Sequence, residues 1–170
     1  MRLTWRSGMD KKLLIRRAVS RDADAIARLS AQAAAEEDVM TVLDAERIRQ
    51  SGFGQNAMFE AWVAQERPNA PLAAHAIITK GYDIRRACPS IVLCDLYVVP
   101  EYRRGGLARR MMSEVARRAR QLGARELAIT TGVKNEVAQR FFAAIGAKSQ
   151  QAAVFMMSAD GIEWLAAESL

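Results

Sequence analysis

The chain has 170 residues, of which 51% are hydrophobic and 26% are charged, a composition typical of one globular domain. Its formal net charge of +6 favours a polyanionic partner, such as a nucleic acid or a phosphorylated cofactor. No apolar run is long enough to cross a membrane, and Cys88 and Cys94 are too few for a disulfide framework or a metal site. We therefore expect a cytoplasmic protein with free thiols. Residues 1–8 are expected to be a leader that could be disordered, ahead of a single domain over residues 9–170.

The first half of the chain predicts an alternation of strands and helices. Residues 13–18 indicate a first strand, and apolar side chains at helical spacing follow a capping Ser20 or Asp22. Asp44 can cap a second, shorter helix that ends near residue 51. Strands are expected over residues 59–64, 72–80 and 91–99.

The second half predicts a helix between two parallel strands. Pro100 ends the strand before it, and a helix is expected from Leu107 to about residue 121. The next expected elements are a strand at 126–131, a helix at 135–145, a strand or strand pair at 150–158 and a short helix at 160–169. A right-handed crossover through the Leu107 helix makes strands four and five parallel. The order predicts a mixed α/β (α+β) domain whose first half is largely antiparallel, with a ligand at the C-terminal end of strand four.

The turn between strand four and the helix is basic and rich in glycine. It reads Arg103, Arg104, Gly105, Gly106, Leu107, Ala108 and Arg109. Two glycines allow a close backbone approach, and a helix N-terminus presents unpaired N–H groups with partial positive charge. With its arginines, this turn is suited to a pyrophosphate. It lacks the Gly-Lys-Ser/Thr of a Walker loop and the third glycine of a dinucleotide fingerprint.

Two motifs carry a resemblance to a known family. The spacing Arg103-x-x-Gly106-x-Ala108 resembles the acetyl-CoA-binding motif of the GCN5-related N-acetyltransferases (GNAT). Downstream, a helix that begins at Asn135 and ends at Gly146 is similar to the second conserved block of that family. The diamine (spermidine/spermine) N-acetyltransferase branch looks closest, through residues 51–55, 59–64 and 94–98.

The resemblance implies a GNAT fold with a mixed sheet of six to seven strands, in which parallel strands four and five splay around acetyl-CoA. It implies acetyl transfer to a primary amine of a small molecule by direct attack, in a protein that forms a homodimer. The residues implied in holding acetyl-CoA are Leu96, Val98, Arg103, Arg104, Gly105, Gly106, Leu107, Ala108, Arg109, Asn135, Ala138 and Phe142.

Two positions depart from the pattern of the family, and both concern proton transfer. Phe142 stands where the family usually has a tyrosine that acts as the general acid, and Cys94 replaces the glutamate of the branch. We hypothesise that Asp95, or water held by it, is the base and that Tyr97 or Tyr82 donates the proton. The expected substrate residues are Tyr82, Asp83 and Asp95.

Other interpretations remain open at this level. Phe142 and Cys94 favour a degenerate acyl-CoA-binding sensor or partner protein with weak turnover. The arginine-rich helix favours an acetyltransferase for a tRNA-linked or peptide amine, although nucleic acid is disfavoured because no aromatic residues interleave with the arginines. His75, the only histidine, is interpreted as a core or edge residue, and Cys94 is disfavoured as a nucleophile because no histidine lies beside it.

Overall fold

The computed structural model describes residues 13–151 and 153–168. The expected leader, residues 1–8, lies outside the described residues. The chain divides into two compact units, Met1–Asn135 and Glu136–Leu170, which are considered separately below. Across the described ranges, no helix combines the length and the apolar character that crossing a membrane requires.

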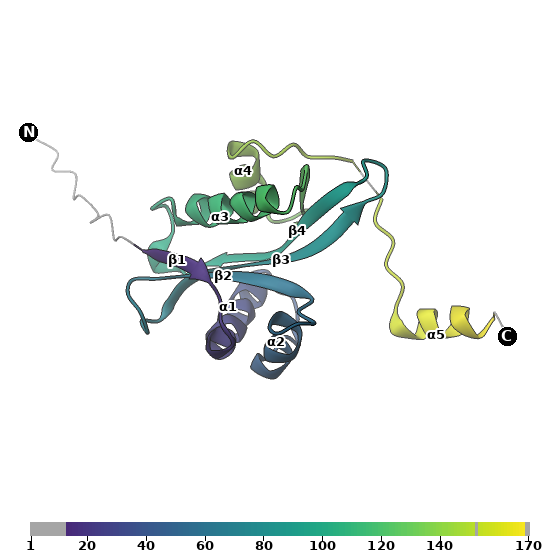
Figure 1. Ribbon diagram of the computed structural model, residues 1–170, viewed down its shortest axis with the longest axis horizontal. Helices are drawn as coiled ribbons and strands as arrows, with labels where there is room; N and C mark the ends of the chain where they lie inside the picture. The colour runs from purple at the N-terminus through teal and green to yellow at the C-terminus, as the bar shows by residue number, and fades with distance from the viewer. Residues whose placement is uncertain (1–12, 152, 169–170) are drawn as a thin grey trace, which may run out of the picture. The chain divides into compact units, whose positions relative to one another are not determined.

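The first unit is built on a five-stranded sheet in the order β1-β2-β3-β4-β5 (Figure 1). Its strands are β1 (Leu14–Arg17), β2 (Phe59–Gln65), β3 (Leu72–Asp83), β4 (Cys88–Val98) and β5 (Glu126–Ile129). The first four strands pair antiparallel, and β4 and β5 are parallel, which confirms the expected mixed topology. The expectation of six to seven strands is wrong for the described part of the chain, which forms five.

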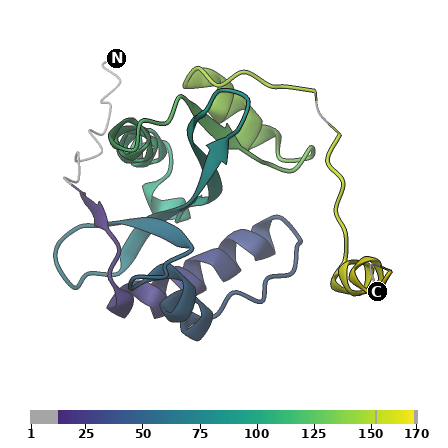
Figure 2. The same ribbon diagram turned by 45° about the vertical axis from the view of Figure 1, so that its right-hand side comes forward.

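Helices cover both faces of this sheet (Figures 1 and 2). On one face lie the short η1 (Ser20–Asp22), α1 (Ala23–Glu36) and α2 (Ala45–Gly52), and on the other lies α3 (Leu107–Gln121), which follows η2 (Pro100–Tyr102). The Asp44 side chain accepts a hydrogen bond of 2.8 Å from the backbone nitrogen of Arg47, which confirms the expected cap of α2.

Each face of the sheet has its own apolar core. Beneath α1 and α2, the buried cluster includes Ile26, Leu29, Ile48, Val63 and Ile77. On the opposite face, α3 buries one side of its surface, formed by Leu107, Met111, Met112, Val115 and Ala119. The period of two along a strand sends alternate side chains to these two cores, so central strands are buried on both faces.

The second unit contains α4 (Glu136–Ala144) and α5 (Ala159–Ala167). The Ser158 side chain caps α5 by accepting a hydrogen bond of 3.2 Å from the backbone nitrogen of Gly161, and the expected short C-terminal helix is confirmed. The strand expected over residues 150–158 is wrong, because no described residue of this segment is in a strand. A strand requires a neighbouring ladder to pair its backbone groups, and apolar composition alone does not supply one.

Candidate functional site

The turn that leads into α3 is shaped by left-handed backbone conformations. Gly106 is the N-cap of α3 with φ of 78°, and Arg104 also has a positive φ, of 61°. No side chain caps this helix, so none competes for the N–H groups of its first turn. Residues 104–106 are exposed, whereas Leu107 is buried and anchors the start of the helix. The turn can therefore present several backbone N–H groups to an anion.

Next to this turn, one edge of β4 is not paired with a described strand. β5 pairs only with Ser90–Leu93, so the rest of β4 has no strand partner on that side among the described residues. The backbone nitrogen of Val99 donates to Ala73 of β3 at 3.0 Å. Because polar groups alternate between the two edges of a strand, those of Leu96 and Val98 point away from β3. This open edge can accept an extended ligand in the manner of an added strand.

Arg103 leaves the turn and folds back onto α1. Its guanidinium donates to both carboxylate oxygens of Glu36 at 2.7 and 2.8 Å, and its Nε donates to the Val98 carbonyl at 2.7 Å. Its Cζ lies 5.3 Å from the ring centroid of Tyr97, whose hydroxyl donates to Glu36 at 2.6 Å. Hydrogen bonds from Arg103 and Tyr97 lower the pKa of Glu36. Arg103 therefore braces the end of β4 against α1.

A β-bulge at Cys94 turns the following residues to the other face of the sheet. The register pairs Ile78 with Leu93 and Ile77 with Asp95, which leaves Cys94 as the extra residue. In a regular strand, Leu93 and Asp95 would share a face because they are two residues apart. Here Leu93 lies in the row that faces α3, and Asp95 faces α1. The bulge thus brings the Asp95 carboxylate against α1.

Asp95 is held there by two side chains from distant parts of the chain. Its Oδ2 accepts a hydrogen bond of 2.9 Å from Ser30 Oγ on α1 and lies 2.7 Å from His75 Nε2 on β3. Burial raises the pKa of Asp95, but hydrogen bonds from His75, Ser30 and the Leu96 backbone, with the attraction of His75, outweigh it and leave that pKa below its ordinary value. The carboxylate is therefore ionised near neutral pH.

Tyr97 follows on the same face as Asp95, and its hydroxyl stays protonated. Burial, followed by the hydrogen bond to Glu36 and the charge of that carboxylate, raises the pKa of Tyr97 to about 12. The ring centroid of Tyr97 lies 6.4 Å from that of His75. Asp95 and Tyr97, two expected site residues, are thus brought to one face, together with Ser30 and His75.

The other expected substrate residues lie elsewhere. Asp83 is six residues beyond Ile77, the strand partner of Asp95, which places it roughly 20 Å away along β3. Its carboxylate pairs with Arg86 at 2.7 Å, and the hydrogen bonds from Arg86 lower its pKa. Tyr82 is exposed beside it. The structure does not bring Tyr82 and Asp83 together with Asp95.

The expected residues of the second motif fall on both sides of the unit boundary. The Asn135 side chain donates to Glu37 Oε1 at 2.6 Å, which ties the end of the first unit to the end of α1. Ala138 and Phe142 lie on α4 in the second unit, where the Phe142 ring centroid is 5.2 Å from that of Phe141. Phe142 has no proton to donate, whatever it contacts.

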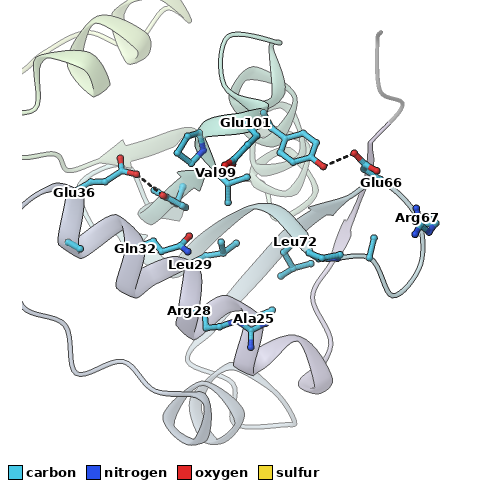
Figure 3. A pocket seen from close by; sticks show the side chains of 16 residues that line it. Ala25, Arg28, Leu29, Gln32, Glu36, Glu66, Arg67, Leu72, Val99 and Glu101 are labelled. Atoms are coloured by element: carbon cyan, nitrogen blue, oxygen red, sulfur yellow. Dashed lines mark hydrogen bonds between the residues drawn. The ribbon is translucent and has the colours of Figure 1, made fainter. Parts of the chain in front are cut away.

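A cleft of about 900 Å³ opens beside this face, between α1, the β2–β3 loop and the end of β4 (Figure 3). Tyr97 and Glu36 form one part of its wall. At another part, the Tyr102 hydroxyl donates to Glu66 at 2.6 Å. Arg28 and Arg67 also line it. Its size falls within the range of small-molecule sites.

Sequence reasoning missed Ser30 and His75 as members of this site, and it missed the contact of Glu36 with Arg103. The interpretation of His75 as a core residue is confirmed, since it is 0% exposed, but its ring is bound to Asp95. These contacts join residues 20 to 67 positions apart, and no local pattern marks them. The one usable signal was a histidine in the middle of an apolar strand, because a buried polar side chain requires a partner.

Comparison with known proteins agrees with this geometry. The chain is 29% identical over 144 residues to the thialysine N-epsilon-acetyltransferase of Sus scrofa, covering 80% of this chain and 84% of the relative. The crystal structure of a ribosomal-protein-alanine N-acetyltransferase from Brucella melitensis biovar Abortus 2308 aligns with a TM-score of 0.70 at 18% identity, covering 86% of this chain and 99% of the other. The aminoglycoside N-acetyltransferase AAC(6')-Iy, in complex with CoA, aligns with a TM-score of 0.65 at 20% identity, covering 85% and 98%.

The family model for the acetyltransferase (GNAT) family matches residues 23–147, from the start of α1 to just beyond α4. That span contains the open edge of β4, the turn before α3 and the Asp95 network. The chain belongs to the GNAT acetyltransferase family and is an N-acetyltransferase.

Proposed function

We propose that this protein transfers the acetyl group of acetyl-CoA to the primary amine of a small molecule by direct attack. The observation that carries the proposal is the junction at the end of β4. There, an open strand edge leads into an uncapped helix N-terminus, and an ionised carboxylate lies on the adjacent face. The first two features suit a long thiol ester with a pyrophosphate, and the third suits a cationic acceptor.

On the donor side, the residues present fit acetyl-CoA. The backbone groups of Leu96 and Val98 would pair with the pantetheine arm, and the N–H groups of residues 104–109 would hold the pyrophosphate. The family resemblance also implies Asn135, Ala138 and Phe142 in holding the cofactor. A backbone N–H near Val98 would polarise the carbonyl of the thioester, in the role of an oxyanion hole. When bound, acetyl-CoA supplies an activated acyl group with a thiolate as leaving group.

On the acceptor side, the chemistry requires a neutral amine nitrogen. The neutral nitrogen attacks the carbonyl carbon, so that the C–N bond forms as the C–S bond breaks. The acylated nitrogen then loses one proton to water, and the thiolate takes up one proton, so the step is balanced. The low pKa of Asp95 makes its carboxylate a poor proton acceptor near neutral pH, so we assign it to binding the acceptor rather than to base catalysis. Of the two candidate proton donors we favour Tyr97, because Tyr82 lies at the far end of the β3–β4 hairpin.

The test follows release of the CoA thiol from acetyl-CoA in the presence of single amines. The panel contains thialysine, spermidine, sisomicin and a peptide with an N-terminal alanine. Turnover on one of the small amines supports the proposal. Turnover on the peptide alone would indicate that the acceptor is a protein. Replacing Tyr97 with Phe should lower kcat by about 10²-fold or more if its hydroxyl is the proton donor.

Direct attack is distinguished from a covalent mechanism by mass spectrometry. We expect no acetylated form of the protein after incubation with acetyl-CoA alone, because Cys94 Sγ has only Thr79 Oγ1 at 3.5 Å and the Val92 carbonyl at 3.7 Å as described partners. Neither group activates a thiol. An acetylated Cys94 that disappears on addition of amine would contradict the sequential mechanism.

A second candidate function is a sensor or partner protein that binds acyl-CoA with little turnover. It is favoured by Phe142, which cannot protonate the departing thiolate, and by the absence of a glutamate at Cys94. Tight binding of CoA by calorimetry, together with no thiol release on any amine of the panel, would support it.

The proposal also includes a cytoplasmic homodimer with one N-acetyltransferase domain over residues 9–170. The free thiols of Cys88 and Cys94 fit a reducing compartment. The resemblance to the diamine N-acetyltransferase branch favours the dimer. Light scattering during size-exclusion chromatography measures the mass in solution, and a single species of 18.8 kDa would contradict the dimer.

A further inference from the structure

The helices on the two faces of the sheet differ in charge. α3 carries five arginines and one glutamate, whereas α1 and α2 together carry three basic and three acidic side chains. The loop between α1 and α2 adds further acidic residues, at positions 37, 38 and 44. Because α3 lies on one face of the sheet and α1 and α2 lie on the other (Figure 2), the fold gathers positive charge on the α3 side.

Most arginines on the exposed side of α3 have no acidic partner. Within residues 13–151 and 153–168, the guanidinium groups of Arg109 and Arg120 form no hydrogen bond or ion pair. Arg110 donates only to a backbone carbonyl, at 2.6 Å, and keeps its full charge. Arg117 pairs with Glu114 at the surface. These arginines follow α3 over roughly 16 Å, since the rise of a helix is 1.5 Å per residue.

A cluster around Glu60 extends the positive charge from α3 onto the sheet. Side-chain nitrogens of Arg118 of α3, Arg17 of β1 and Lys80 of β3 lie 2.7, 3.4 and 3.6 Å from the same atom, Glu60 Oε1. One negative charge is thus shared by three cations. Arg17 and Lys80 keep 58% and 49% of their side chains exposed. The cluster therefore presents excess positive charge to solvent.

The chemistry of this side fits the phosphodiester backbone of a nucleic acid. Guanidinium groups donate paired hydrogen bonds to phosphate, and a row of them matches a row of phosphates. α3 contains no aromatic residue on which single-stranded bases could stack, but contact with the phosphates of a duplex requires none. A membrane surface fits less well, because Ser113 and Ala116 lie between the exposed arginines, where a membrane-binding helix has large apolar side chains.

We propose that the α3 side of the molecule is a docking surface for duplex RNA. We call it the α3 basic surface. One side of α3 is buried against the sheet, so the helix is not free to enter a deep groove. It can lie across phosphates, and duplex RNA is bound mainly in this way, through its backbone and across a wide, shallow minor groove. The inference is independent of acetyl transfer. The surface consists of Arg17, Lys80, Arg109, Arg110, Arg117 and Arg120.

The test measures binding of a fluorescently labelled RNA duplex of about 16 base pairs by the full chain, using fluorescence anisotropy at several salt concentrations. We expect saturable binding that weakens steeply as the salt concentration rises, because phosphate contacts release counterions. The variant with Arg117→Gln and Arg120→Gln should bind about tenfold more weakly, and its salt slope should be smaller by about two. No binding by the wild type would overturn the proposal.

A matched control removes the same charge from the opposite face. Arg47→Gln with Arg49→Gln on α2 lowers the net charge equally, and both of these arginines are already paired with aspartates. We expect this variant to keep its affinity for the duplex within about twofold of the wild type. Equal losses of affinity in the two double variants would show that only the net charge matters and would overturn the proposal.

Three competitors test the assignment to duplex RNA. Saturating CoA should leave binding of the duplex unchanged, and displacement by CoA would place the RNA on the turn before α3 instead. A single-stranded RNA of the same length should bind more weakly, and tighter binding than that of the duplex would contradict the proposal. Vesicles containing anionic lipid should not displace the duplex, and displacement would assign the surface to a membrane. None of these measurements requires turnover, so the proposed function and this inference can fail separately.

Discussion

Glu60 of β2 and Asp95 of β4, on the two strands that flank β3, are partly or fully buried carboxylates whose charges are stabilised in different ways. The Glu60 side chain is 2% exposed and lies on the α3 face of the sheet. Its charge is matched by cations: Arg118 donates at 2.7 and 2.8 Å, and Arg17 and Lys80 lie 3.4 and 3.6 Å away. Burial raises the pKa of Glu60, but these three cations more than offset it and leave the pKa below its ordinary value.

Asp95 lies on the opposite face, where hydrogen bonds from His75, Ser30 and the Leu96 backbone, with the attraction of His75, stabilise its charge. A serine hydroxyl and an imidazole N–H hold it, and the face that remains exposed has no cation among the residues with described positions. Both carboxylates are ionised, but Glu60 is saturated by its own chain and Asp95 is not. A partly buried carboxylate whose partners orient it without neutralising it keeps the capacity to bind a cation.

The largest effect should come from Glu60→Gln. It leaves the partly buried Arg118 without its carboxylate, and we expect a loss of about 3 kcal/mol in the free energy of unfolding. Urea denaturation measures it. Glu114→Gln, which breaks the i,i+3 pair with Arg117 on the surface of α3, is the control and should cost no more than about 0.5 kcal/mol. Equal losses in the two variants would show that the Glu60 cluster contributes no more than a surface pair.

In contrast to Glu60→Gln, Asp95→Asn should lower activity much more than stability. We expect kcat/KM for 1,3-diaminopropane to fall about ten- to a hundredfold, because the amide cannot match an ammonium charge. Propylamine should be affected much less, and the unfolding free energy should change by only about 1 kcal/mol. Steady-state kinetics and urea denaturation give both quantities. A large loss of stability with unchanged selectivity would place Asp95 in the same structural class as Glu60.

Ser30→Ala tests how much the orientation of the Asp95 carboxylate depends on the hydrogen bond from Ser30. It removes one hydrogen bond to Asp95 and leaves that of His75, so we expect about threefold lower kcat/KM for the diamine and about 1 kcal/mol less stability. Ser30→Thr keeps the hydroxyl and is the control for its loss. Equal kcat/KM values in Ser30→Ala and the wild type would show that the Ser30 hydroxyl does not orient Asp95 for binding.

The smallest expected effect concerns the pH dependence of the unfolding free energy at acidic pH. Both carboxylates have a folded-state pKa below the ordinary values of 4.5 for Glu60 and 3.8 for Asp95. Each therefore contributes stability that is fully present above its ordinary value and is lost as the pH falls through its folded-state pKa. We expect the unfolding free energy to decline below about pH 4.5 and to decline less steeply in Glu60→Gln. An identical slope in the variant and the wild type would contradict the lowered pKa of Glu60.

Much of the fold follows from local sequence. The cap at Asp44, the stop at Pro100 and the buried side of α3 each depend on residues within a few positions of one another, so the pattern predicts them directly. The same holds for the turn before α3, where the positive φ of Gly106 and the missing cap are local properties. The strand expected at residues 150–158 was wrong because a strand depends on a partner, which local sequence does not specify.

Local sequence is enough to predict the part of the candidate site that is made of backbone: a strand, a basic glycine turn and an uncapped helix N-terminus. Only the tertiary structure decided the part that is made of side chains. The extra residue at Cys94 turns Asp95 toward α1, and β3 and α1 then supply the two donors that hold it. It also decided that Arg103 braces Glu36 instead of facing the turn. The physical reason is that backbone geometry is set by near neighbours, whereas the charge and orientation of a buried side chain depend on residues that only folding brings into contact.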